Sequence, residues 1–389
     1  MLRAKRLKKI PQYLFAEIDK MKSAMKARGI DIVDLSIGDP DLPTPKHLLT
    51  ELKKATGDPK TFGYPPYEGI YEFRKSVSIW YKERFNVDLD PNTEVLSLIG
   101  SKEGIAHVFL AFVDNGDYTL IPDPGYPVYN IGTLLADGIP YKMPLVERNN
   151  FLPDFSAIDK KILSKAKLMF INYPNNPTSA VAPKEFLQEA VSLASKYGFL
   201  ICSDFAYSEI AFDGYKPMSI LEIPGAKDVA IEFHSLSKTY NVTGWRIGMA
   251  VGSSAAIKEL ATIKTNIDSG IYKALQYAGA VALTGSQKHL IRLNSIYEER
   301  RNILINGLNS LGCDIKKTKA TFYVWARVPK GYTSSSFTQA ALEKANVMVV
   351  PGSGYGKYGE GYFRISITTP KERIEKAIER FKGNNITWN

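Results

Sequence analysis

The chain has 389 residues, 44% hydrophobic and 23% charged, a balance typical of a globular protein with a large buried core. The four histidines lack the spacing of a metal site, and two cysteines exclude a disulfide framework and fit a reducing cytoplasm. No apolar run is long enough to span a membrane, and the net charge of +10 comes without a nucleic-acid-binding motif. We therefore expect the protein to bind neither a membrane nor a nucleic acid.

The order of apolar and polar segments predicts an α/β protein. The charged residues 1–6 have no hydrophobic signal core behind them, which favours a cytoplasmic location. Residues 30–37 alternate like a strand. From about residue 45 to 285, predicted strands and helices alternate, which favours a mostly parallel sheet covered by helices. Residues 290–311 predict one long connecting helix, and the segments after it predict a compact α+β unit.

The first candidate binding segment is Ile99-Gly100-Ser101-Lys102-Glu103-Gly104, between a predicted strand at 95–98 and a predicted helix. Backbone N–H groups at a helix start, together with a serine hydroxyl, can bind an anion. Alternatively, Ser101 only caps the helix, and both can be true because both use the same N–H groups. Further along, Tyr126 lies in a turn rich in proline. It offers a flat face for an aromatic ring, or it is a core tyrosine.

Two predicted buried strands are followed by polar residues. The strand at 168–171 leads into residues 172–179, where two prolines and three asparagines predict a stiff turn that fixes the amide of Asn176. A plain loop is the alternative. Asp204 follows the apolar run 198–202, and the carboxyl ends of such strands are where open α/β sheets bind ligands. A strand-end aspartate can also only cap the next turn.

The most informative segment is Ser235-Leu236-Ser237-Lys238-Thr239, with Arg246 shortly behind it. The amine of Lys238 can form a Schiff base, while the nearby hydroxyls and the guanidinium can hold a phosphate. Pyridoxal phosphate requires both functions at one site. The segment therefore predicts this cofactor.

The earlier segments supply the rest of a pyridoxal phosphate site. Asp204 can pair with a protonated pyridine nitrogen and keep the ring electron-poor. Tyr207 and Asn176 can form hydrogen bonds with the phenolic oxygen of the ring, and Tyr126 can stack on the ring. Because each of these residues has a plain structural alternative, the prediction depends on their occurring together with Lys238.

The order and spacing of these motifs resemble the class I/II, fold-type I pyridoxal-phosphate-dependent aminotransferases over nearly the whole chain. The motifs are Ile37–Pro40, Tyr64–Gly69, Gly100–Gly104, Tyr126, Asn176–Thr178, Asp204–Tyr207, Ser235–Arg246 and Tyr362–Ser366. The resemblance implies an α/β fold with a large, mostly parallel-sheet cofactor domain at 45–285. It also implies a smaller α+β domain at 286–389, with the N-terminal arm (1–44) packed against it.

The resemblance also implies residue roles, a homodimer with shared active sites, and amino acid and 2-oxo acid substrates. The implied catalytic residues are Lys238, Asp204 and Tyr207. The implied cofactor-binding residues are these three with Tyr64, Ser101, Lys102, Tyr126, Asn176, Ser235, Ser237 and Arg246, of which Tyr64 would reach the phosphate of the neighbouring subunit. The implied substrate-binding residues are Tyr13, Gly38, Lys102, Tyr126, Asn176 and Arg364. Ser179 departs from the family's Asn-Pro-Thr-Gly turn, so we predict a local adjustment of that turn.

The substrate is indicated by the runs Arg6–Phe15, Ile37–Pro45 and Pro351–Arg364, which resemble bacterial LL-diaminopimelate aminotransferases. In that subfamily Tyr13 and Lys102 would lie near the distal end of the substrate. The resemblance thus implies amino transfer between LL-2,6-diaminopimelate, a metabolite of lysine biosynthesis, and 2-oxoglutarate. Aspartate, alanine or glutamate aminotransferases share almost all of these motifs and remain alternatives, as does a pyridoxal-phosphate-dependent C–S β-lyase on the same scaffold.

Overall fold

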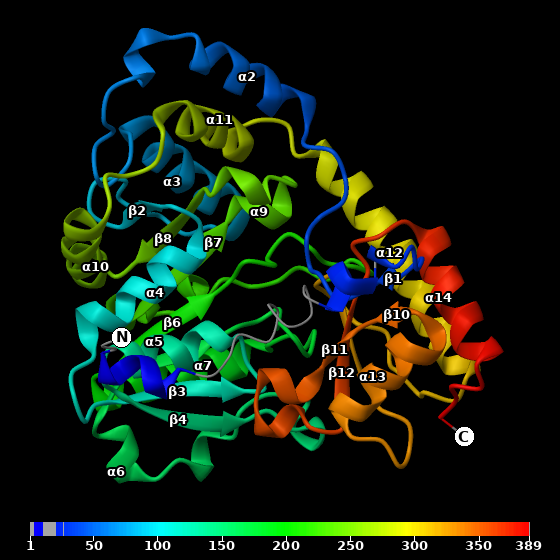
Figure 1. Ribbon diagram of the computed structural model, residues 1–389. Helices are drawn as coiled ribbons and strands as arrows, with labels where there is room; N and C mark the ends of the chain where they lie inside the picture. Colours follow the sequence, from blue (N-terminus) through cyan, green and yellow to red (C-terminus); the bar gives the residue numbers. More distant parts are fainter. Residues whose placement is uncertain (1–3, 11–20, 26, 389) are drawn as a thin grey trace.

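The computed structural model describes residues 4–10, 21–25 and 27–388 of the chain (Figure 1). Within these residues, seven strands form one sheet in the order β2-β8-β7-β6-β5-β3-β4. They are β2 (Val95–Leu98), β3 (Tyr118–Asp123), β4 (Ile139–Pro144), β5 (Ala166–Ile171), β6 (Leu200–Asp204), β7 (Ala230–Ser235) and β8 (Gly248–Gly252). Only β8 runs antiparallel to its neighbours. The predicted α/β fold with a mostly parallel sheet is confirmed.

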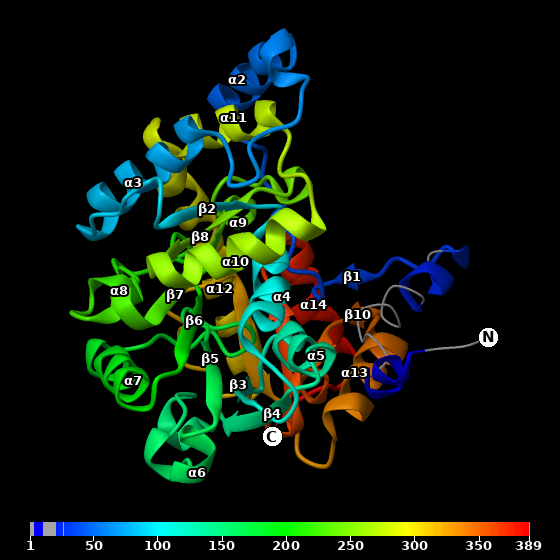
Figure 2. The same ribbon diagram turned by 90° about the vertical axis from the view of Figure 1, so that its left-hand side faces the viewer.

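Helices cover both faces of this sheet. They include α2 (Lys46–Thr56), α3 (Tyr71–Phe85), α4 (Ser101–Phe112), α5 (Pro127–Leu135), α6 (Lys160–Leu163), α7 (Lys184–Tyr197), α8 (Ala226–Val229), α9 (Leu236–Thr239), α10 (Ser254–Ile267) and α11 (Lys273–Thr284). Figure 2 shows α4 and α5 on one side of the strands and α7 and α8 on the other. Helices α2, α3 and α11 pack together near the β2 edge (Figure 1).

Successive residues of β5 alternate between two hydrophobic clusters, because strand side chains point to opposite faces in turn. Leu168 and Phe170 pack with residues of α4 and α10. Met169 and Ile171 pack with residues of α3 and α7 on the other face. A strand that is apolar on both faces is typical of a parallel sheet buried between helix layers. Polar side chains that bind a ligand must therefore lie beyond the end of such a strand.

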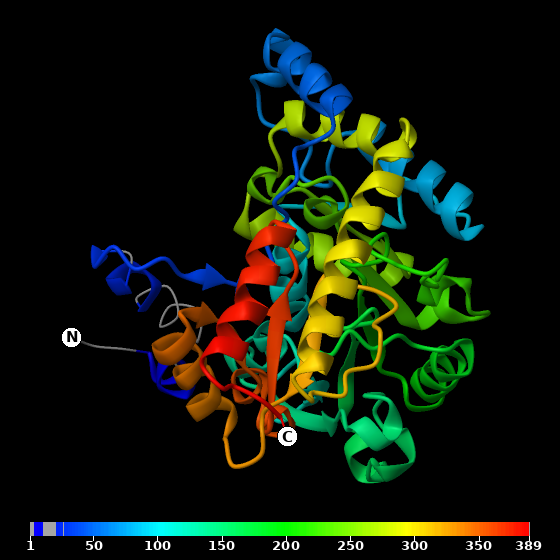
Figure 3. The same ribbon diagram turned by 90° about the vertical axis from the view of Figure 1, so that its right-hand side faces the viewer.

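The C-terminal part contains α12 (Lys288–Ser310), β9 (Tyr323–Arg327), α13 (Ser334–Ala345), β10 (Val347–Met348), β11 (Val350–Pro351), β12 (Tyr362–Ser366) and α14 (Lys371–Gly383). Strands β11, β12 and β9 form an antiparallel sheet. Helix α12 runs beside α14 in Figure 3 and shares a hydrophobic cluster with β9, α13 and β12. This part therefore has a core of its own.

The N-terminal segment reaches this C-terminal part through β1 (Val33–Asp34), which pairs in parallel with β10. The strand predicted over 30–37 is thus only two residues long. The reason is local, since the Asp34 carboxylate accepts hydrogen bonds from both the N–H and the hydroxyl of Ser36, at 3.0 and 2.6 Å, and turns the chain out of the strand. Among the described residues, no helix combines the length and apolar character needed to cross a bilayer.

Candidate active site

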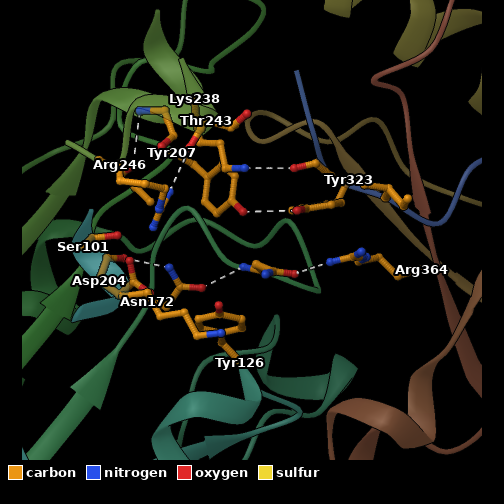
Figure 4. Close-up of a pocket in the computed structure, with 17 residues that line it drawn as sticks. Ser101, Tyr126, Asn172, Asp204, Tyr207, Lys238, Thr243, Arg246, Tyr323 and Arg364 are labelled. Carbon is orange, nitrogen blue, oxygen red and sulfur yellow. Dashed lines mark hydrogen bonds between the residues drawn. The ribbon is translucent and has the colours of Figure 1, made fainter. Parts of the chain in front are cut away.

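A cavity of about 280 Å³ lies beyond the strand ends, between the large sheet and the C-terminal part. Its walls come from segments far apart in sequence: Ile37, Gly38, Ser101, Lys102, Tyr126, Asn172, Asn176, Asp204, Ala206, Tyr207, Ser235, Ser237, Lys238, Thr243, Arg246, Tyr323 and Arg364. In Figure 4, Ser101 and Asp204 lie at one end of this pocket and Arg364 at the other. The structure therefore brings together every predicted site residue that it describes, except Tyr64.

Lys238 enters the pocket from the short helix α9. Its Nζ donates a hydrogen bond of 2.9 Å to the carbonyl oxygen of Gly38. Burial lowers the pKa of Lys238 to about 8, opposed by Asp39 and assisted by the positive charges of Arg364 and Arg246. An amine with this pKa is partly neutral near physiological pH, which a nucleophile requires.

An anion-binding cradle forms around the start of α4. Gly100 occupies the N-cap position with φ of 72°, and no side chain caps the helix, so the alternative that Ser101 is the cap is wrong. A Cβ on Gly100 would lie 2.3 Å from Nη2 of Arg246, so only glycine allows this approach. Burial and the charge of Arg246 lower the pKa of Lys102. Two cations beside the N-terminus of a helix favour a phosphate.

Two serines complete the cradle from β7 and α9. Ser235 caps α9, and its Oγ accepts a hydrogen bond of 3.2 Å from the N–H of Ser237. The hydroxyl of Ser237 is buried and has no hydrogen-bond partner within the described part of the chain. Since buried hydroxyls are nearly always bonded, this one indicates a ligand.

Asp204 ends β6 with its carboxylate buried in the pocket wall. The Tyr129 hydroxyl donates a 2.7 Å hydrogen bond to Oδ2, whereas Oδ1 finds no partner among the residues that the structure describes. Burial raises the pKa of Asp204 to about 6, and the Tyr129 bond opposes this rise. A buried carboxylate with one oxygen open is suited to a protonated ring nitrogen.

At the opposite end, Arg364 of β12 is 2% exposed. Its Nη1 donates to Oδ1 of Asn176 at 2.9 Å, and its Nη2 donates to the carbonyl oxygen of Ser36 at 2.7 Å. The guanidinium carbon lies 4.0 Å from the centre of the Tyr323 ring. These contacts hold a planar cation in one orientation, which suits bidentate binding of a carboxylate.

The Asn176 turn contains the one departure from the family pattern. Ser179 keeps the left-handed conformation, with φ of 59°, so the predicted local adjustment of the turn is wrong. Its hydroxyl is hydrogen-bonded to Thr321 Oγ1 at 2.8 Å and to the carbonyl oxygen of Tyr323 at 2.6 Å. These bonds offset the cost of a non-glycine residue in this region.

Among the described residues that were predicted for the site, only Tyr64 does not line the pocket. Tyr13 lies outside the described residues. Tyr64 is 86% exposed in the single chain, among other exposed aromatic side chains such as Phe62, Tyr67 and Tyr71. Gly38 does line the pocket, and a Cβ there would lie 1.9 Å from the Tyr323 hydroxyl oxygen. The chain therefore has little room for any larger residue at position 38.

Sequence reasoning missed Tyr129, Asn172, Thr243 and Tyr323. Tyr129 and Asn172 bind Asp204, the latter by a 2.6 Å hydrogen bond from Nδ2 to the aspartate carbonyl oxygen. The spacing from Tyr126 to Tyr129, one helical turn, was the available signal for Tyr129. The sequence around Tyr323 does not indicate that this residue lines the pocket, because its position depends on the pairing of β9 with β12.

The residues present fit pyridoxal phosphate. The unbonded Oδ1 of Asp204 matches the ring nitrogen of the cofactor. The unbonded hydroxyl of Ser237 and the close approach of Arg246 to Gly100 match its phosphate. A pocket of this kind on this fold defines a fold-type I pyridoxal phosphate enzyme.

Comparison with known proteins agrees. The profile of the family described as aminotransferase class I and II matches residues 30–381. The chain is 56% identical to LL-diaminopimelate aminotransferase of Moorella thermoacetica over 98% of each protein, and 53% identical to the one from Halothermothrix orenii over 100% of each. The solved structure of BacF from Bacillus subtilis, 36% identical, matches with a TM-score of 0.96, covering 100% of this chain and 99% of that one. The chain belongs to the class I and II aminotransferase family, and it is an aminotransferase that uses pyridoxal phosphate.

Proposed function

We propose that this aminotransferase moves the amino group of LL-2,6-diaminopimelate to 2-oxoglutarate. The observation that carries the proposal is the full-length similarity, above 50% identity, to two proteins named LL-diaminopimelate aminotransferase. The pocket supports it, since Arg364 suits one carboxylate of an amino acid and Lys102 is a second cation that lines the same pocket. Tyr13 is proposed to assist at that distal end.

Within this proposal, Lys238 is the residue that binds the aldehyde of pyridoxal phosphate and later moves the proton at the substrate α-carbon. When bound, pyridoxal phosphate supplies an electron sink for the α-carbon. Asp204 keeps the ring nitrogen protonated by presenting its open Oδ1, and Tyr126 supports the ring face. The lowered pKa of Lys238 supports its use as a base.

The other binding residues act by orientation. Tyr207 and Asn176 are proposed to bond the ring oxygen. The Tyr207 hydroxyl lies 3.2 Å from that of Tyr323, and Oδ1 of Asn176 accepts from Arg364, which leaves Nδ2 of the amide as donor. Gly38 is proposed to border the substrate carboxylate beside Arg364. The phosphate is assigned to the cradle of Ser101, Lys102, Ser235, Ser237 and Arg246, with Tyr64 added by a second subunit.

The test is a comparison of kcat/KM for LL-diaminopimelate, aspartate, alanine and glutamate as amino donors with 2-oxoglutarate as acceptor. We expect LL-diaminopimelate to exceed each of the others by at least about 100-fold, near the 3 kcal/mol that one well-placed charged contact provides. Similar values for LL-diaminopimelate and aspartate would contradict the substrate assignment. With cystathionine, whose Cβ–S bond can break, formation of pyruvate, ammonia and homocysteine without any acceptor would instead indicate a β-lyase.

We also propose a homodimer with shared active sites. Its support is the exposure of Tyr64 together with Phe62, because large aromatic side chains gathered on a surface mark an interface. Mixing Tyr64→Ala and Lys238→Ala subunits tests it. A hybrid dimer should regain one working site of two, because intact Lys238 then meets intact Tyr64 of the other chain. Absence of recovery would contradict a shared site.

Two further assignments belong to the proposal. The division into an arm (1–44), a cofactor domain (45–285) and a small domain (286–389) is supported by the separate hydrophobic clusters of the large and C-terminal parts. A cytoplasmic location is supported by Cys202 and Cys313, both free thiols. Limited proteolysis near residues 44 and 285 and cell fractionation test these points.

A further inference from the structure

We propose that Glu103, held by the buried Lys264, is a positioning residue for the phosphate-binding turn of residues 99–102. The inference rests on the proposed phosphate site and goes beyond it, because neither side chain lines the pocket. Glu103 lies in the first turn of α4, and Lys264 comes from α10, which packs against α4.

Glu103 closes the turn from both sides. Its backbone N–H donates to the Gly100 carbonyl oxygen at 3.2 Å, and its Oε2 accepts a hydrogen bond of 2.9 Å from the N–H of Ile99. This reciprocal pairing resembles a capping box, in which an acid at the third helical position reaches back to an N–H before the helix. The turn between these bonds contains Ser101 and Lys102, which line the pocket at the proposed phosphate site.

Lys264 holds the carboxylate of Glu103 in place. The lysine side chain is 0% exposed, and its Nζ lies 3.5 Å from Oε2 of Glu103 and 2.8 Å from both carboxylate oxygens of Asp268. A fully buried ammonium is costly unless it is paired, so the site is built around it. Its charge also offsets that of Glu103, which would otherwise oppose a phosphate dianion at the same helix end.

The cluster is not a metal site. Ligand atoms of Glu103, His107 and Asp268 do lie within 4.8 Å of one another, as metal ligands would. However, the Lys264 ammonium bonds Asp268 and approaches Glu103, so a cation already occupies the position between the carboxylates. Oε1 of Glu103 lies 2.6 Å from Nδ1 of His107, but the two atoms form no hydrogen bond with each other.

The test compares binding of pyridoxal phosphate and of pyridoxal, which lacks the phosphate, to cofactor-depleted protein. Glu103→Ala should raise the Kd for pyridoxal phosphate about tenfold while changing the Kd for pyridoxal less than about twofold, since one hydrogen bond to the turn is lost. Glu103→Gln should recover most of the affinity, because its amide oxygen can still accept from Ile99. Lys264→Met should change the two Kd values as Glu103→Ala does. The control Lys258→Met, at an exposed site on the same helix, should bind both ligands as the wild type does.

Equal weakening for both ligands, or no weakening at all, would overturn the inference. If Glu103→Ala does not fold, Glu103→Asp makes the same comparison, because its side chain is one methylene too short to reach Ile99. Wild-type protein that binds pyridoxal as tightly as pyridoxal phosphate would refute the phosphate site itself, and with it the proposed function. A wild-type preference for the phosphate that survives every variant would refute only the role of Glu103.

Discussion

The hydroxyl of Tyr129 donates a hydrogen bond of 2.7 Å to Oδ2 of Asp204, the buried carboxylate at the end of β6. This bond fixes which carboxylate oxygen faces the pocket. It also favours the ionised form of Asp204 against the effect of burial. We therefore expect Tyr129 to assist Asp204 in keeping a ring nitrogen protonated.

Tyr129→Phe should weaken catalysis without abolishing it. The variant loses the donor to Oδ2, so the pKa of Asp204 should rise further and less carboxylate should be ionised. We expect kcat to fall about 10- to 100-fold, the range of one lost hydrogen bond to a charged group. Unchanged kcat from pH 6 to 8 would contradict this role. Phe is the matched change because it keeps the ring that packs on Phe170.

Asp204 should also make the cofactor-free protein less stable as pH rises. Its pKa is about 6 in the folded state against an ordinary 3.8, so the folded protein binds the proton more tightly. The resulting stabilisation is fully present below pH 3.8 and is lost as pH rises through 6, by up to about 3 kcal/mol. Urea unfolding from pH 4 to 7, with Asp204→Asn as the reference, measures it. Parallel pH profiles for the two proteins would count against the raised pKa.

Arg364→Lys tests the need for a planar cation. Lysine keeps the charge but cannot bond Asn176, Ser36 and a substrate carboxylate at once. We expect kcat/KM to fall about 100-fold, or 2.7 kcal/mol. The same change at Arg373, which pairs with Asp31 on the surface, is the control and should have little effect. Equal activities of the two variants would show that orientation at position 364 is unimportant.

Ser179 offers a test of stability. Ser179→Ala removes the two hydroxyl bonds and keeps a left-handed residue with a Cβ, so it should lower the free energy of unfolding by about 1–3 kcal/mol. Ser179→Gly loses the same bonds but relieves the backbone, so its loss should be smaller by about 1 kcal/mol. Urea denaturation of the cofactor-free proteins decides between them. An alanine variant as stable as the glycine variant would argue against backbone strain at this position.

Much of this architecture could be predicted from local sequence. The apolar strand ending at Asp204 and the run around Lys238 carry their signal within a few residues, because strand periodicity and small hydroxyl residues are local features. The resemblance to aminotransferases then predicted that Arg364 is a substrate-binding residue. In contrast, the short β1 strand depends on how the Asp34 side chain turns the backbone. Propensity alone predicts a longer strand there.

Residues set by tertiary pairing could not be predicted. Tyr323 reaches the pocket only because β9 pairs with β12 in one register, which places Tyr323 opposite Ser366. In the sequence, Lys264 resembles the exposed lysines of other helices. In the structure it is fully buried beside the carboxylates of Glu103 and Asp268. Long-range packing of α4 on α10 decides this, and no spacing within either helix shows it.

The most direct measurement for the central claim is reduction of the holoenzyme with borohydride, followed by digestion and peptide mass spectrometry. If Lys238 is the amine that binds the aldehyde, one peptide should carry the pyridoxyl phosphate group, with the modification on Lys238, and Lys238→Ala should carry none. A modification on another lysine, or one that survives in Lys238→Ala, would contradict the account.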